Sequence, residues 1–101
     1  MFNGNEGSVI TRTEAATYTG RFTTANPDPD TVRAVFFGKD RLQAILDQPD
    51  CMGIRVFYAL NVDESNTLVC AGALENEDTM ATGVIVELGS PCPRVCGDVN
   101  F

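Results

Sequence analysis

The chain has 101 residues, of which 44% are hydrophobic and 21% are charged, and its fourteen acids against seven bases give a net charge of −7. This composition is that of one globular domain and differs from that of disordered chains. Lys39 is the single lysine and no basic stripe exists to neutralise phosphates, so nucleic acid and anionic membrane surfaces are excluded as partners.

The first predicted element is a helix that begins at Thr11. Glu14 follows at the spacing of a capping box, in which each residue caps a free backbone N–H group of the other. Ala15, Tyr18 and Phe22 recur at helical spacing and form one narrow apolar face. Several threonines and a glycine weaken this helix, so we expect it to need a surface on which to pack.

The remaining elements follow from local patterns of apolar residues. Residues 23–31 hold two prolines and two aspartates and are expected to form an exposed connection. The stretch "VRAVFFG" is apolar on both faces, which is typical of a central or doubly covered strand. "KDRLQAILDQP" predicts a helix of two to three turns that ends near its proline. Strands are then predicted at residues 54–60, 67–74 and 84–88, as an antiparallel meander.

This order predicts a single small α+β domain over residues 1–101. Two helices would pack on a mostly antiparallel sheet of about four strands. A flexible N-terminal arm, residues 1–8, and a Cys/Pro-rich C-terminal tail, residues 89–101, would flank the domain, and the tail shows no helix or strand pattern.

Catalysis is not predicted. Histidine is absent, which removes the usual general base near neutral pH and the usual partner of a serine or cysteine nucleophile. Asp28 and Asp30 lie in a proline-rich loop with no apolar pocket to shift a carboxyl pKa. We therefore expect a protein that is not an enzyme, with no catalytic residue and no cofactor.

Two acidic loops are weak candidates for binding a hard cation such as calcium. The loop "NVDESN" contributes Asp63, and the loop "ENEDT" contributes Glu75, Glu77 and Asp78. The first loop lacks the glycine and the closing glutamate of an EF-hand, so its ligands do not follow the order that gives tight coordination. Solvated turns are the alternative explanation for both loops.

Four cysteines, Cys51, Cys70, Cys92 and Cys96, are the main candidates for chemistry. Disulfides are the favoured interpretation, because the tail has too little apolar surface to hold itself on the sheet and a covalent link would fix it. Four thiols allow three full pairings in one chain, and bridges between chains are a further option. A zinc site of all four thiolates, a redox couple and inert thiols remain alternatives, although the spacing fits neither paired zinc ligands nor a C-x-x-C motif.

The compartment stays open. The first eight residues have neither a positive stretch nor an apolar core, so no Sec-type signal peptide is predicted, and no apolar run is long enough to insert into a membrane. The even cysteine count favours an oxidising environment. We expect either a cytoplasmic protein or one that becomes extracellular by a non-classical route.

The run "FFGKDRLQAILDQPDCMGIRVFY", together with "PCPRVC" in the tail, resembles a group of small uncharacterised bacterial proteins. These share a phenylalanine-glycine turn, a short helix, a C-x-GIR strand start and a Cys-Pro tail. The resemblance implies no activity, and no binding or catalytic residue is transferred from it.

We therefore expect a non-enzymatic structural or interaction module. Strands that are apolar on both faces and a sheet with exposed edges favour a subunit that assembles with itself, as a closed oligomer or a filament, or binds another protein. Phe2 and Phe101 are candidate apolar anchors on otherwise polar chain ends. The alternative is a small metal-binding or thiol redox protein that uses the cysteine cluster.

Overall fold

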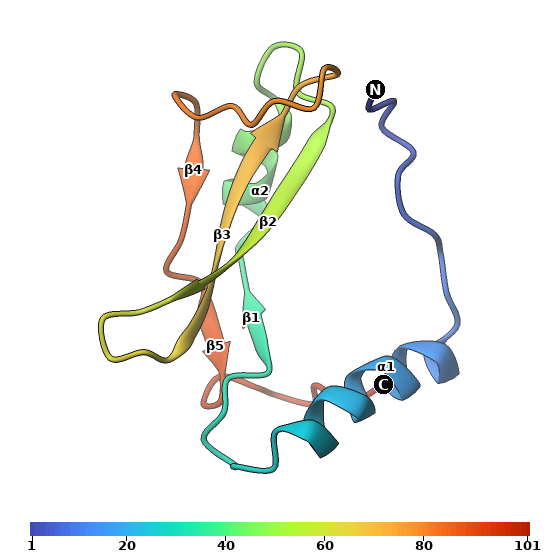
Figure 1. Cartoon of the computed structure of the whole chain (residues 1–101), viewed down its shortest axis with the longest axis vertical. Helices are drawn as coiled ribbons and strands as arrows, with labels where there is room; N and C mark the ends of the chain where they lie inside the picture. The colour runs from blue at the N-terminus through green and yellow to red at the C-terminus, as the bar shows by residue number, and fades with distance from the viewer.

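A computed structural model describes all residues, 1–101, and confirms the α+β class with two helices and two antiparallel sheets (Figure 1). The helices are α1 (Arg12–Ala25) and α2 (Lys39–Leu46). The strands are β1 (Ala34–Phe36), β2 (Gly53–Leu60), β3 (Asn66–Ala73), β4 (Ile85–Val86) and β5 (Ser90–Cys92). Neither helix is long and apolar enough to cross a membrane.

The larger sheet is the predicted meander, in the order β2-β3-β4. β2 and β3 pair antiparallel over their full length, from Gly53 opposite Ala73 to Leu60 opposite Asn66. β4 adds only a two-residue pairing to the other edge of β3. The outer edge of β2 therefore has no partner strand in the chain, and it forms an eight-residue free edge.

The core lies between α2 and one face of this sheet. Ile45 of α2 is fully buried against Cys70 of β3 and Val86 of β4, and Ile54 of β2 packs at the side. Gln48 fixes the end of α2 to the start of β4, because its amide donates to the Ile45 carbonyl at 2.9 Å and accepts from the Val84 N–H at 2.7 Å. The core is small: only 8 of the 101 residues are buried.

β3 carries most of the buried positions. Five of the eight buried residues belong to this strand. They are Thr67, Cys70, Ala71, Gly72 and Ala73. All are small, which lets the neighbouring strands and α2 approach β3 closely. An added Cβ at Gly72 would meet the Met80 sulfur at 2.8 Å and the Cys51 sulfur at 2.9 Å.

The first helix forms as predicted but does not pack as predicted. Thr11 caps α1 through the Glu14 N–H at 3.1 Å, and the Glu14 carboxylate accepts from the Thr11 N–H at 3.2 Å, which completes the capping box. The helix continues to Ala25, so it takes three residues from the expected connection 23–31. No residue of α1 is buried, and Figure 1 shows it lying apart from the three-stranded sheet.

The second difference concerns the strand expected at residues 32–37. It is three residues long, and it is neither central nor covered on both sides, since Phe36 is 68% exposed. It joins β5 in a separate two-stranded sheet, with Ala34 opposite Cys92 and Phe36 opposite Ser90. The tail was predicted to have no strand but contains β5. β1 and β5 are each three residues long, and each provides the backbone partners of the other.

The N-terminal arm returns to the far end of the larger sheet (Figure 1). The Phe2 N–H donates to the Glu75 carbonyl at 2.8 Å. The Arg55 guanidinium lies 5.3 Å from the centre of the Phe2 ring, in a cation–π contact. Arg55 also donates to the Glu77 carbonyl at 2.9 Å and to the Thr79 hydroxyl at 2.8 Å, so one side chain joins the arm, β2 and the loop after β3.

Candidate functional site

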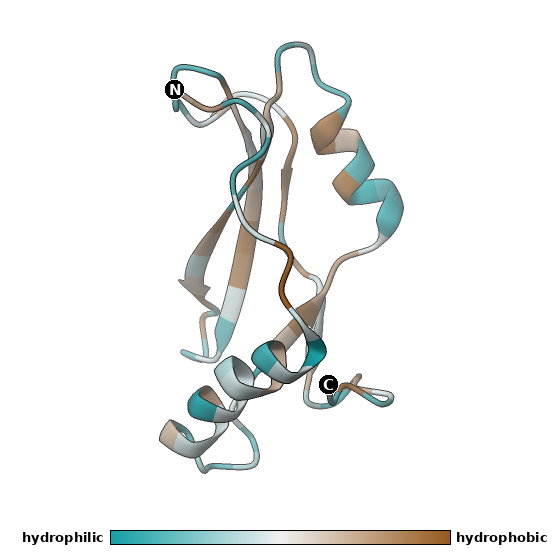
Figure 2. Ribbon diagram, turned by 90° about the vertical axis from the view of Figure 1, so that its right-hand side faces the viewer, coloured by the Kyte–Doolittle hydropathy of each residue, from teal (hydrophilic) through white to brown (hydrophobic).

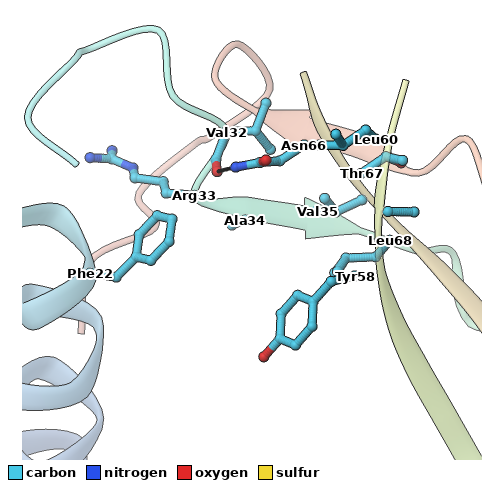
Figure 3. A pocket seen from close by; sticks show the side chains of 11 residues that line it. Phe22, Val32, Arg33, Ala34, Val35, Tyr58, Leu60, Asn66, Thr67 and Leu68 are labelled. Atoms are coloured by element: carbon cyan, nitrogen blue, oxygen red, sulfur yellow. Dashed lines mark hydrogen bonds between the residues drawn. The ribbon is translucent and has the colours of Figure 1, made fainter. Parts of the chain in front are cut away.

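One of two concave features of similar size is an apolar groove of about 540 Å³ between β1, the C-terminal part of α1 and the end of the β2–β3 hairpin. We call it the hairpin groove. Eight of its eleven lining residues are hydrophobic. Figure 3 shows Phe22 pointing from α1 toward β1, with Tyr58 and Leu68 on the opposite side. A volume of several hundred cubic ångströms is within the range of sites that bind ligands or side chains.

The groove exists because α2 is too short to cover the sheet. Alternate residues of β2 lie on one face, so Tyr58 and Leu60 lie on the same face as Ile54, which packs near α2. α2 has only eight residues and leaves the hairpin end of this face bare. Tyr58 is accordingly 96% exposed and Leu60 is 64% exposed.

One long polar contact links the two walls of the groove. The Asn66 side-chain amide, at the start of β3, donates to the Val32 carbonyl just before β1 at 3.5 Å (Figure 3). Arg33 is the only charged residue of the lining. The other polar groups of the lining are the hydroxyls of Tyr58 and Thr67 and the Asn66 amide, so the groove is mostly apolar with few polar groups.

The cysteines form one disulfide, between Cys92 and Cys96. The two cysteines are only four residues apart in the sequence, with their Cα atoms 4.9 Å apart, so the bond closes a small loop inside the tail. It does not join the tail to the sheet, although such a link was expected. Backbone pairing anchors the tail, since the Arg33 N–H donates to the Cys92 carbonyl at 2.8 Å and the Cys92 side chain is 2% exposed. The expectation that sulfur bonding holds the tail to the rest of the chain is therefore wrong.

Cys51 and Cys70 are free thiols; Cys70 belongs to the core and Cys51 packs against it. The half-buried Cys51 thiol lies 3.2 Å from the Gly53 carbonyl, to which it donates. Cys70 is 2% exposed between Ile45 and Val86, and burial raises the pKa of its thiol because the thiolate loses its hydration. A raised pKa lowers the thiolate fraction, so Cys70 behaves as a small hydrophobe. No three cysteine or acidic side chains of the chain come together in a group that could hold a metal ion.

The acidic loops lie at opposite ends of β3, so their carboxylates do not converge. Asp63 accepts from the Ser65 hydroxyl at 2.6 Å and the Ser65 N–H at 3.0 Å, and these hydrogen bonds lower its pKa below its ordinary value. In the other loop, Asp78 accepts from the Asn76 amide at 3.1 Å, and Glu77 lies 2.9 Å from the Met1 amino group. Glu75 contributes its backbone carbonyl to the N-terminal arm. The candidate cation site is thus divided between two turns.

The two candidate anchor residues have different surroundings. Phe2 is half-buried and packs within its own chain, against Arg55. Phe101 is 56% exposed and lines a second cavity of about 560 Å³ with Gly20 and Thr23 of α1 and Ala34 of β1. An anchoring contact of Phe101 with another molecule stays a prediction.

The hairpin groove was not predicted from the sequence, although a signal for it exists. "VFYAL" in β2 is apolar at consecutive positions, so one face of the strand must stay uncovered unless a second layer of the chain reaches it. The sequence predicts two helices for this layer, but in the structure only the eight-residue α2 packs on the sheet. Comparison of the chain with protein-family models, with curated proteins and with solved structures found no match. Fold and site together define a small α+β domain with an uncovered apolar groove.

Proposed function

We propose that the chain is a non-enzymatic subunit that assembles with further copies of itself. The observation that carries the proposal is the accessible surface of the isolated chain, which is 7611 Å² for a mass of 10.9 kDa. The scaling of surface with mass gives about 5,600 Å² for a compact folded monomer of this size. The chain thus exposes about 2,000 Å² more than a compact monomer does.

The shape of the chain supports the same proposal. Its radius of gyration is 15.0 Å, against about 13 Å for a compact domain of 100 residues. A standard protein–protein interface buries about 800 Å² on each partner, so the excess surface is enough for two such contacts per copy. Two contacts per copy are what a ring or a filament requires, whereas a twofold dimer requires one.

The exposed surface is also apolar in the right places. Large hydrophobic side chains are exposed on α1, on β2 and before β5, among them Tyr18, Tyr58 and Leu88 at 61%, 96% and 84%. The free edge of β2 offers unpaired backbone groups on the strand that carries Tyr58. Single exposed apolar residues are ordinary on a protein surface, but large exposed apolar side chains on α1, on β2 and in the segment before β5 together favour an interaction surface.

Sizing with light scattering, over a wide range of concentration and with or without reductant, tests the proposal. We expect a mass that rises with concentration to several times that of one chain. Intact mass without reductant should show no covalent dimer, because the disulfide joins Cys92 and Cys96 within one chain. A particle that keeps the mass of a single chain at every concentration would refute the proposal.

A further inference from the structure

The segment from Val9 to Phe22 carries large apolar side chains that its own chain leaves largely exposed. Val9 is 102% exposed and Ile10 is 45% exposed, directly before α1. Figure 2 shows them as a hydrophobic stretch at the junction of the N-terminal arm and α1. Tyr18 and Phe22 continue this surface along the helix, where they are 61% and 40% exposed.

α1 requires such a partner for its stability. It has 14 residues, a length at which an isolated helix is marginal in water even for good helix formers. Its composition is poor, because six of those residues are threonines or glycine and these have low helix propensity. The Thr11 capping box contributes about 1 kcal/mol at one end and does not replace packing along the helix.

The hairpin groove of the same chain cannot receive Val9 and Ile10. Phe22, near the C-terminal end of α1, already forms one wall of the groove (Figure 3). From Arg12 to Phe22 the helix rises by about 15 Å at 1.5 Å per residue, and Val9 and Ile10 precede its first turn. While α1 is formed, its N-terminal end is therefore held away from the groove that its C-terminal end borders.

We propose that Val9, Ile10 and the first turns of α1 of one copy bind in the hairpin groove of a second copy. This proposal rests on the proposed assembly and names the surfaces that make it. This contact would cover both the exposed Val9–Ile10 segment and the apolar hairpin groove. A contact between the β2 edges of two copies would leave both of them exposed. The contact needs about 800 Å² of each partner's surface, well within the excess of about 2,000 Å².

Charge favours the same arrangement. The chain is acidic overall, yet α1 carries Arg12 and Arg21 against the single acid Glu14. The hairpin loop that borders the groove beyond Leu60 carries Asp63 and Glu64, both exposed. Arg12, at the start of α1, would lie beside this acidic loop and attract it, in a chain whose net charge of −7 otherwise makes copies repel; Arg33, the one charged residue of the lining, adds nothing to this attraction.

Donor and acceptor are different surfaces, so each copy offers one of each. Such a contact is heterologous, and copies add head to tail into a ring or an open filament. This property gives a sharp test with two defective variants. The donor variant is V9D/I10D, and the groove variant is Y58D/L60D. All four positions are substantially exposed in the single chain, so neither variant removes a core contact.

Each variant alone should remain monomeric in light scattering, while an equimolar mixture should form a one-to-one heterodimer that grows no further. The heterodimer uses the intact groove of one chain and the intact segment of the other. The control is V62D, since Val62 is 105% exposed in the same hairpin but does not line the groove. It should assemble like the wild type, whereas each defective variant should associate at least about tenfold more weakly. Far-UV circular dichroism of the monomers verifies their folds.

The two proposals fail in different ways. If the wild type assembles and V9D/I10D assembles equally well, the contact lies elsewhere, as at the free edge of β2, and the groove proposal is overturned while assembly stands. If the two variants do not associate when mixed, the groove proposal is also overturned. A wild type that stays monomeric at all concentrations overturns both.

Discussion

Reduction of the Cys92–Cys96 disulfide should destabilise the fold only modestly. The bond closes a loop of five residues, counting both cysteines, because their separation in sequence is four. The chain-entropy relation for such a loop gives about 2 kcal/mol of stabilisation at 25 °C. A bridge from Cys92 to Cys51, as an attachment of the tail to the sheet would require, closes a loop of about 42 residues and gives about 4 kcal/mol.

Urea unfolding distinguishes these values. We expect the reduced chain to lose about 2 kcal/mol of unfolding free energy with little change in the denaturant slope. The measurement belongs at low protein concentration, because assembly stabilises the folded state by mass action. The matched control is the C92A/C96A variant, which should match the reduced wild type and should not respond to reductant.

Two results would refute this reasoning. A loss of 4 kcal/mol or more would mean that the bond constrains far more of the chain than five residues. Peptide mapping that links Cys92 or Cys96 to Cys51 would mean the same, and β1–β5 pairing would then not be the main attachment of the tail.

Three further predictions concern the core, a close approach and one carboxylate. Ile45→Ala should lower the free energy of unfolding in urea by about 2 to 5 kcal/mol, because Ile45 is fully buried. The control Leu46→Ala, at a position that is 44% exposed, should lower it by about 1 kcal/mol or less. Equal losses for the two variants would contradict the assigned core. Gly72→Ala should cost about 1 to 3 kcal/mol, because its Cβ would meet two sulfur atoms within 3 Å, while Gly53→Ala meets nothing within 4 Å and should be neutral or slightly stabilising. Ser65→Ala removes the main hydrogen bond that lowers the Asp63 pKa, so NMR titration should show that pKa rising toward its ordinary value of 3.8. Since the folded pKa is lowered, the Asp63 interaction stabilises the fold above this ordinary value and is lost as pH falls through the folded pKa; an unchanged titration would refute the assignment.

Local signals in the sequence predicted the elements that depend on neighbouring residues. The capping box at Thr11 and Glu14 placed the start of α1, because both partners lie within one helical turn. The β2–β3–β4 meander followed from strand patterns separated by polar loops, and consecutive antiparallel strands pair without a long crossover. In both cases the structure that a segment favours by its own sequence is the structure that it adopts in the folded chain.

Contacts between distant segments were predicted less well. β1 and β5 are separated by more than fifty residues, and their three-residue pairing depends on backbone hydrogen bonds that carry little sequence information. The proline-rich tail was therefore expected to need a covalent attachment. The unpacked α1 was also missed, because an apolar face predicts that a helix will be covered but does not state which chain covers it.

The candidate site shows the same division. The cysteines were identified from the sequence, but their pairing depends on distances that spacing alone does not define. The hairpin groove exists because α2 is shorter than the strands that it covers. Both α2 and β2 have eight residues, but a helix rises less than half as far per residue as a strand does, so one end of the sheet stays uncovered. Each length could be read from the sequence, whereas the register of α2 on the sheet could not.

The concentration of buried positions on β3 has a consequence for how this sequence can vary. Outside that strand, only three residues of the chain are buried. Folding alone thus places strict demands on few sites, and most of the surface is free to drift unless something outside the chain restrains it. A saturation mutagenesis screen scored separately for folding and for association would then give two maps with little overlap, one following β3 and the other following whatever the chain touches.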